Sequence, residues 1–187
     1  RTYPHFIELM NSIGVLSQPT EMSFSVRNDA VDLEYNGNSL NSLFAQRRNL
    51  IRPRFLTMVA EIARFNKEVR TAAEIDQKKT IGDFLSARRY SQLFKENYLL
   101  PMVSAIWSMG LARCMDFPLG FFVRFFDNHG LLNIINRPQW FTIIGGSSSY
   151  IAPLTSSYTD RIRLQTPVLS VERDDELVTI ITREEKY

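Results

Sequence analysis

The spacing of apolar positions changes twice along the chain. Apolar residues recur at helical spacing from Phe6 to Val15, and Gly14 stands where that helix would end. Residues 22–26 and 31–35 instead alternate apolar and polar side chains, which is typical of strands with one buried face. Turn-forming residues separate these two segments, so the pattern predicts a β-hairpin.

The middle of the chain has the period of amphipathic helices. One helix is expected from about Leu40 to Ile51, ending before Pro53 because the residue before a proline avoids helical angles. Further helices are predicted over 55–65, from Thr80, from about Pro101 and over 117–126. Residues 71–79 are polar without periodicity, which indicates a loop. Gly130 is expected to end the last helix in the left-handed conformation.

The chain becomes strand-like again after Pro138. Strands are predicted over 139–144, 162–171 and 178–182. A short helix is expected from about Ser148, and the last two strands would pair across Asp174 and Asp175. Because strands and helices are clustered and do not alternate, the order predicts an α+β fold. Its mostly antiparallel sheet would join the first hairpin to residues 139–144 and be covered on one face by a helical layer.

Composition limits the class of protein. A length of 187 residues suits one domain, or one domain and part of a second, and 44% hydrophobic residues can form a packed core. The net charge of +2 is too small to create an electrostatic field that would favour binding of nucleic acid. The sequence has no run of about 18 apolar residues, so no transmembrane helix is predicted. The single cysteine, Cys114, excludes an intrachain disulfide and suits a reducing cytoplasm, which is the expected location.

The usual catalytic and metal-binding motifs are missing from the sequence. His5 and His129 are the only histidines, and neither belongs to an H-E-x-x-H motif, so no metal site is predicted. The run 146–149 is not G-x-S-x-G, there is no P-loop, and no G-x-G-x-x-G follows a predicted strand. The sequence therefore contains neither an evident catalytic residue nor a complete dinucleotide-binding motif.

One segment, residues 140–154, combines an apolar strand, a pair of glycines and the start of a helix. Gly145 and Gly146 allow a tight turn and a close approach of another group to the backbone. A turn without a ligand has the same pattern. A second predicted strand then begins after Thr166 and Pro167.

These features resemble the flavin-containing amine oxidoreductases, the family of amine oxidases and phytoene desaturases. The resemblance covers nearly the whole chain and is closest to a bacterial subgroup described as predicted NAD/FAD-binding proteins. Several segments in the same order carry it: 1–14, 37–55, 98–102, 105–108, 116–118, 122–126, 128–132, 140–154 and 160–171. Several separate matches are more specific than one glycine motif.

The resemblance implies an FAD-dependent oxidoreductase with a discontinuous FAD domain. Residues 1–160 would form a substrate-binding domain with a preceding helix, and residues 161–187 would be strands that return to the FAD domain. The chain would then be a fragment that is inactive alone, and FAD is expected in the full-length protein only. Apolar surface that the FAD domain would cover is expected to promote self-association.

The resemblance also assigns roles to particular residues. Val168 would offer its backbone to the adenine edge of FAD, and Gly145 and Gly146 would form a turn beside the cofactor. A valine in the core of a strand is the alternative. Gln139 and Phe141 share one face of the expected strand and would face the substrate, although a solvent-facing Gln139 fits the pattern equally. The implied reaction is hydride removal from an amine or a carbon–carbon bond of a small apolar substrate, such as a lipid.

Two clusters allow more than one interpretation. Trp107 and the phenylalanines of 117–126 would line a tunnel for the substrate or form part of the core. The other cluster is a group of basic side chains beside apolar ones: Arg47, Arg48, Arg52 and Arg54. It would make a peripheral contact with anionic lipid or form a solvated face. The alternative function is therefore a non-catalytic module that binds lipid or another protein.

Overall fold

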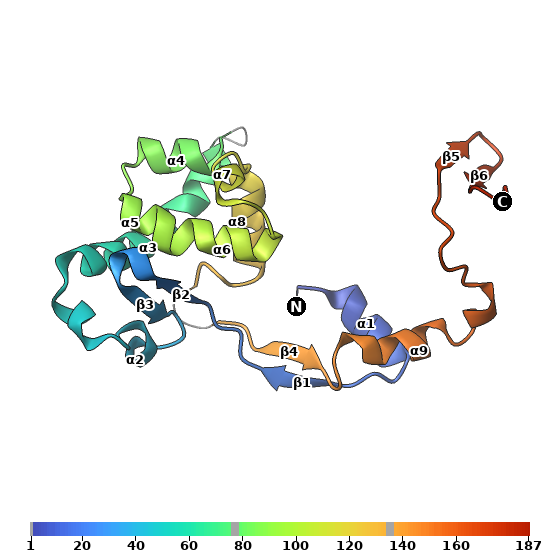
Figure 1. Ribbon diagram of the computed structural model, residues 1–187, viewed down its shortest axis with the longest axis horizontal. Helices are drawn as coiled ribbons and strands as arrows, with labels where there is room; N and C mark the ends of the chain where they lie inside the picture. Colours follow the sequence, from blue (N-terminus) through green and yellow to red (C-terminus); the bar gives the residue numbers. More distant parts are fainter. Residues whose placement is uncertain (1, 76–78, 134–136) are drawn as a thin grey trace. The chain divides into compact units, whose positions relative to one another are not determined.

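The computed structural model describes residues 2–75, 79–133 and 137–187 (Figure 1). The chain forms two compact units. Unit 1 comprises Arg1–Thr2 and Pro19–Thr142, and unit 2 comprises Tyr3–Gln18 and Ile143–Tyr187. The boundary expected between residues 160 and 161 therefore lies inside unit 2. Helices and short antiparallel strand pairs together give the α+β fold that the sequence predicted.

Unit 1 contains a hairpin followed by helices. The hairpin consists of β2 (Ser25–Asn28), the 3₁₀ turn η1 (Asp29–Val31) and β3 (Leu33–Asn36). The helical segments are α2 (Leu40–Leu43), η2 (Arg47–Ile51), α3 (Pro53–Ile75), α4 (Ile81–Ala87), α5 (Gln92–Phe94), the π-helical η3 (Lys95–Leu99), α6 (Leu100–Trp107), α7 (Leu111–Cys114) and α8 (Leu119–Asn128). The hairpin is antiparallel with Val26 opposite Tyr35, which confirms the prediction.

The core of unit 1 lies around the long helix α3, which packs with α5 and α8 and contacts α4 through the rings of Phe65 and Phe84 (Figure 1). Met58, Phe65 and Val69 are buried along one side of α3. Their spacing is that of an amphipathic helix, so one apolar stripe faces the other helices. The hairpin adds Leu33 and Tyr35 to the same core.

Two predicted helix boundaries are confirmed. Thr80 and Asp83 form a capping box at the start of α4, in which Thr80 Oγ1 accepts from Asp83 N (3.1 Å) and Asp83 Oδ2 accepts from Thr80 N (3.0 Å). The bonds that Thr80 N and Thr80 Oγ1 donate to the Asp83 carboxylate lower the pKa of Asp83. At the end of α8, Gly130 has φ +67°, as predicted for the left-handed cap.

The helix expected from Leu40 to Ile51 is instead two short pieces, α2 and η2. Gln46 lies between them, and its Oε1 accepts from Glu34 N (3.1 Å) and Asn49 Nδ2 (3.2 Å). These bonds hold Gln46 against β3 at the break between the two pieces. The loop expected over 71–79 is also partly wrong, because α3 continues to Ile75. Residues 76–78 of that loop lie outside the described residues.

The sheet differs from the prediction in its pairing. Strand β4 (Trp140–Ile143) forms where expected, but it pairs with β1 (Ser17–Thr20) and does not extend the β2–β3 hairpin. The pattern missed β1 because its four residues, Ser-Gln-Pro-Thr, include no aliphatic or aromatic side chain and do include a proline. The structure therefore has three two-stranded sheets among its described residues, where one larger sheet was expected.

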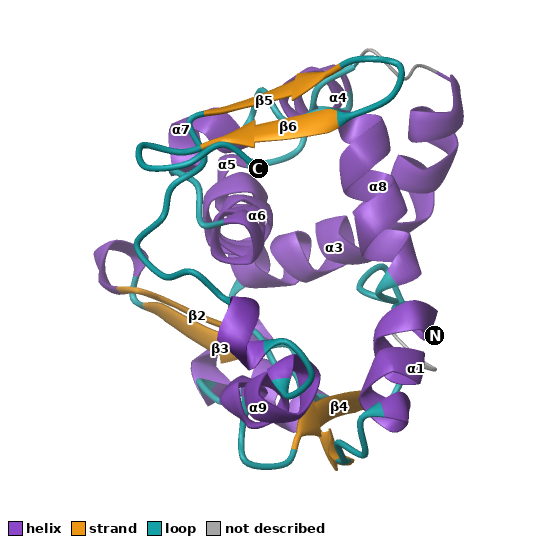
Figure 2. Cartoon of the chain, turned by 90° about the vertical axis from the view of Figure 1, so that its right-hand side faces the viewer, coloured by secondary structure: helices purple, strands orange, loops and turns teal. Residues whose placement is uncertain are grey.

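Unit 2 consists of short elements. They are α1 (Pro4–Ser12), η4 (Ser147–Tyr150), α9 (Ile151–Thr155), η5 (Thr159–Arg161), β5 (Ser170–Arg173) and β6 (Val178–Ile181). Strands β5 and β6 form an antiparallel hairpin (Figure 2) with Val171 opposite Ile180, which confirms the predicted pairing. The strand expected over 162–171 is wrong for most of its length, since β5 begins only at Ser170.

Unit 2 exposes large aliphatic side chains. Leu164 is 82% exposed, Leu177 67% and Val171 60%. Exposed apolar side chains in such number favour association. We expect the chain to self-associate as its concentration rises, measured by sedimentation velocity. Replacing Leu164 and Leu177 together with Ser should shift the distribution toward monomer, and unchanged oligomers in that variant would contradict this origin.

Within residues 2–75, 79–133 and 137–187, no helix is both long and apolar enough to cross a membrane.

Candidate functional site

A small cavity lies in unit 1 beside the start of β4. Its volume is about 90 Å³. Most of its lining is aromatic or aliphatic: Met22, Phe24, Tyr35, Tyr98, Met102, Leu131, Pro138 and Trp140. Sites for whole drug-sized ligands are usually about 300–1,000 Å³, so this cavity would hold one end of a ligand.

Polar groups at the cavity are held by the surrounding backbone and side chains. The Tyr35 hydroxyl donates to Asn97 O (2.7 Å), and Asn97 Nδ2 donates to Leu93 O (3.2 Å). Burial raises the pKa of Tyr35, so its phenol stays protonated and acts as this donor. Burial also raises the pKa of Tyr98 to about 12, with Arg137 acting in the opposite direction. Both phenols are therefore neutral near pH 7.

His129 lies at the C-terminus of α8 and contacts two aromatic rings. Its ring stacks on Phe125 at a centroid distance of 4.0 Å and on Trp140 at 6.1 Å. His129 Nδ1 is 2.7 Å from Phe125 O, and because a carbonyl can only accept, Nδ1 carries a proton. The His129 ring therefore lies beside the Trp140 indole at the cavity wall. Sequence reasoning considered His129 only as a metal ligand and missed this aromatic contact.

Arg137 places a cation among the lining residues. Its Nε donates to Asn133 O (3.0 Å) and its Nη1 donates to Gly37 O (3.3 Å). The guanidinium is thereby oriented by two backbone carbonyls, while the residue stays exposed. An apolar cavity with one cationic group at its lining suits a ligand with an apolar body and a polar or anionic end.

The predicted substrate residues lie next to this cavity in the sequence but are not among its lining residues. Gln139 is exposed, and its Nε2 donates to Thr20 O (2.9 Å) and Trp140 O (3.0 Å). Phe141 is 59% exposed. Pro138 and Trp140, on the other side of the alternation, line the cavity instead. The roles of Gln139 and Phe141 toward a substrate remain predictions.

The glycine pair forms the turn that the sequence indicated. Gly145 has φ +80°, and Gly146 has φ +86° with ψ 171°. Residues other than glycine rarely adopt these backbone conformations. A Cβ at Gly145 would lie 2.7 Å from Ser149 Oγ, whereas a Cβ at Gly146 would meet nothing within 4 Å. The backbone of Gly146 is therefore open to approach by another group.

Val168 precedes the β5–β6 hairpin. Its side chain is 54% exposed, which disagrees with the alternative of a core valine. The next residue begins the pairing, since Leu169 N donates to Ile181 O (2.8 Å). Val168 and the glycine pair belong to unit 2, whereas Gln139 and Phe141 belong to unit 1. Val168 is exposed, and a Cβ at Gly146 would meet nothing within 4 Å, so both positions are accessible.

The phenylalanine cluster is mainly core. Phe122 and Phe126 are buried, and the Trp107 ring lies 4.5 Å from the ring of Phe117 and 4.9 Å from that of Phe125. These rings fill the space that a tunnel would need. Phe121 is the exception, with half of its surface exposed.

Metal and thiol chemistry find no support among the described residues. In that part of the chain, no group of three or more His, Cys, Asp or Glu side chains is placed to hold a metal ion. Cys114 is buried, and burial raises the pKa of its thiol. A thiol of this kind is a poor nucleophile near neutral pH.

The fold and the cavity define an α+β protein with an aromatic-lined cavity and a glycine turn that follows it along the chain. Neither the protein-family models nor the curated proteins compared with this sequence match it.

Proposed function

We propose that this chain supplies the substrate-binding part of an FAD-dependent oxidoreductase that removes hydride from an amine or a carbon–carbon bond of an apolar substrate. The aromatic cavity at the start of β4 is the observation that carries the proposal. Its walls are mainly aromatic and aliphatic side chains, and along the chain β4 is followed by the turn at Gly145 and Gly146. The mainly apolar lining of the cavity favours a lipid-like substrate over a small polar amine.

The cofactor would be held in part by the backbones of Val168, Gly145 and Gly146. Bound FAD would accept the hydride, and the protein would orient the substrate and exclude water. The sequence contains no G-x-G-x-x-G, so in this proposal residues outside it bind the pyrophosphate and FAD loads only in the full-length protein. A reducing cytoplasm is the proposed location, where Cys114 would stay a thiol.

Ligand binding to the cavity can be followed through Trp140. Trp107 and Trp140 are the two tryptophans, so a Trp107→Phe background leaves the one at the cavity as the reporter. We expect saturable changes in Trp140 emission when oleate or a long-chain alkylamine is added. Ser23→Leu should weaken that binding by about tenfold, because Ser23 lines the cavity and a larger side chain would fill part of its volume.

The matched control is Ser25→Leu in the same background. Ser25 is exposed on β2 and is not among the lining residues, so the same substitution there should leave binding unchanged. Equal affinities for the two variants would contradict the assignment of the cavity as the ligand site.

The reaction class is tested on the full-length protein. Anaerobic addition of the ligand that binds at Trp140 should bleach the flavin absorbance. Bleaching by an amine would identify the amine as the group that is oxidised, and bleaching by an unsaturated lipid would identify a carbon–carbon bond. Full-length protein that purifies without flavin and takes up none would overturn the enzymatic proposal.

A further inference from the structure

The short helix η2 exposes two adjacent aliphatic side chains at the surface of unit 1. Ile51 is 83% exposed and Leu50 is 52% exposed. Arg47 begins the same turn, and Arg54 follows it in the first turn of α3; both are exposed. We call Arg47, Leu50, Ile51 and Arg54 the η2 surface. It combines large apolar groups with cations on one short stretch of backbone.

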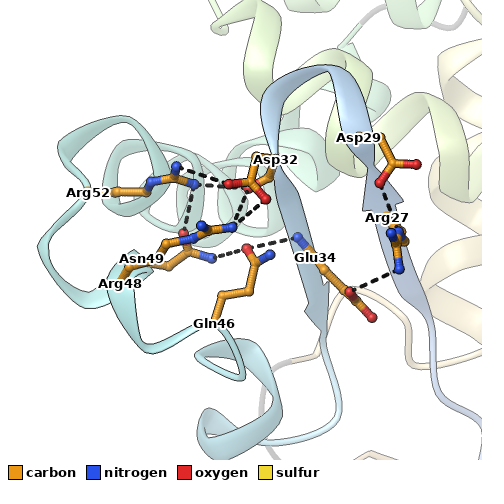
Figure 3. A network of polar contacts seen from close by, with 8 residues as sticks. All are labelled: Arg27, Asp29, Asp32, Glu34, Gln46, Arg48, Asn49 and Arg52. Carbon is orange, nitrogen blue, oxygen red and sulfur yellow. Dashed lines mark hydrogen bonds and ion pairs between the residues drawn. The ribbon is translucent and has the colours of Figure 1, made fainter.

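A polar network holds this turn in place (Figure 3). Asn49 is fully buried within η2, where its Nδ2 donates to Gln46 Oε1 (3.2 Å). Arg48 and Arg52 both form ion pairs with Asp32, and Arg52 Nη1 also donates to Asp32 O (3.0 Å). The two aliphatic side chains are thus displayed by an anchored turn, which lowers the entropy lost when they bind a partner.

The charge around η2 is positive. One carboxylate, Asp32, is shared by the guanidinium groups of Arg48 and Arg52. Arg47 donates instead to the neutral groups Asn41 Oδ1 (2.6 Å) and Phe44 O (3.1 Å), so its charge is not neutralised by these bonds. Positive charge beside exposed aliphatic groups is complementary to an anionic headgroup layer above hydrocarbon.

An open groove of about 490 Å³ borders the η2 surface. Its walls are mainly apolar, and arginines are part of the lining: Val31, Leu33, Phe55, Leu93, Arg52 and Arg54. Guanidinium groups beside an apolar groove match the chemistry of a lipid phosphate with its acyl chain. The groove and the η2 surface therefore indicate the same kind of partner.

We propose that the η2 surface docks unit 1 onto an anionic lipid bilayer. Leu50 and Ile51 enter the boundary between headgroups and acyl chains, and Arg47 and Arg54 contact lipid phosphates. This places the protein on the membrane without spanning it. The inference does not depend on the cofactor or on the cavity beside β4, since it uses residues on a different part of unit 1.

The charge contribution is tested by co-sedimentation of the whole chain with lipid vesicles. Wild type should bind vesicles of phosphatidylcholine mixed with phosphatidylglycerol far better than phosphatidylcholine alone, and salt should weaken that binding. Arg47→Gln/Arg54→Gln should lower the partition coefficient on the anionic vesicles by about 30-fold, because each basic residue near such a surface contributes roughly fivefold. Arg113→Gln/Arg124→Gln removes the same charge from exposed positions on α7 and α8 and should bind like wild type.

The apolar contribution is tested with Ile51→Ser, which should weaken binding by about tenfold. Leu111→Ser is its control, because Leu111 is an exposed aliphatic residue on α7. Circular dichroism should show all variants folded. Equal binding to neutral and anionic vesicles, or unchanged binding of the Arg47/Arg54 variant, would overturn the proposal. So would an oligomer that forms without lipid and is lost in Ile51→Ser, which would assign the surface to a second copy of the chain.

Discussion

Replacing Phe65 with Ala is expected to lower the free energy of unfolding of unit 1 by about 3–5 kcal/mol. Phe65 is 1% exposed and lies in the middle of α3. Its ring is surrounded by four others, with centroid distances of 5.4–5.9 Å to Phe84, Tyr90, Phe94 and Phe122. Removing it leaves a cavity where α4, α5 and α8 meet α3, and the edge-to-face contacts are lost as well.

Urea unfolding monitored by tryptophan emission measures this change, because Trp107 and Trp140 both belong to unit 1. Phe121→Ala is the matched control: it is the same substitution on α8, at a side chain that is half exposed. We expect it to cost about 1 kcal/mol or less, since little surface is removed from the core. Similar losses for the two variants would mean that Phe65 is not the centre of this core.

The sequence predicted elements whose chemistry is local. Helix α4 was predicted to start at Thr80, and the capping box that the structure shows there involves only four consecutive residues. The end of α8 was predicted from Gly130, and the hairpin β5–β6 from its alternating strands and the turn between them. In each case the residues that stabilise the element are contained in it.

Pairing between distant strands could not be predicted in this way. Strand β4 has an apolar pattern, but its partner β1 has none, and a backbone ladder between them needs no apolar side chains on β1. The split of 40–51 into α2 and η2 likewise occurs at Gln46, whose Oε1 accepts from Glu34 N on β3, a contact between separate elements. Hydrophobic periodicity predicts neither the pairing of β1 with β4 nor the hydrogen bond between Gln46 and Glu34.

The candidate site shows the same limit. The resemblance pointed to Gln139 and Phe141, yet the cavity is lined by Trp140, Tyr98, His129 and other residues from five separate segments. Alternation along β4 divides the strand into two faces, but only tertiary packing decides which face adjoins the cavity. His129 at the end of α8 stacks on Trp140, a contact between separate segments that spacing alone does not reveal.

Gly130→Ala is expected to destabilise unit 1 by about 2–5 kcal/mol, for two separable reasons. Gly130 has φ +67° and completes the C-terminal motif of α8, with Gly130 N donating to Asp127 O (2.9 Å) and Leu131 N to Phe126 O (2.8 Å). An alanine in this conformation costs about 1–2 kcal/mol. Its Cβ would also lie 2.5 Å from Pro138 Cδ, and relieving such an overlap costs a further 1–3 kcal/mol or so.

A double-mutant cycle separates the two costs. Pro138→Ala removes the ring atoms that the new methyl group would meet, so Gly130→Ala should be less destabilising in that background, by roughly the steric share of 1–3 kcal/mol. Gly120→Ala is the control on the same helix. Its Cβ would meet nothing within 4 Å, so alanine there should leave stability unchanged or raise it by up to about 1 kcal/mol. Because Gly130 and Pro138 both line the cavity, Gly130→Ala should also weaken ligand binding reported by Trp140. A fully additive cycle would show that the left-handed backbone, and not contact with Pro138, is what requires glycine at position 130.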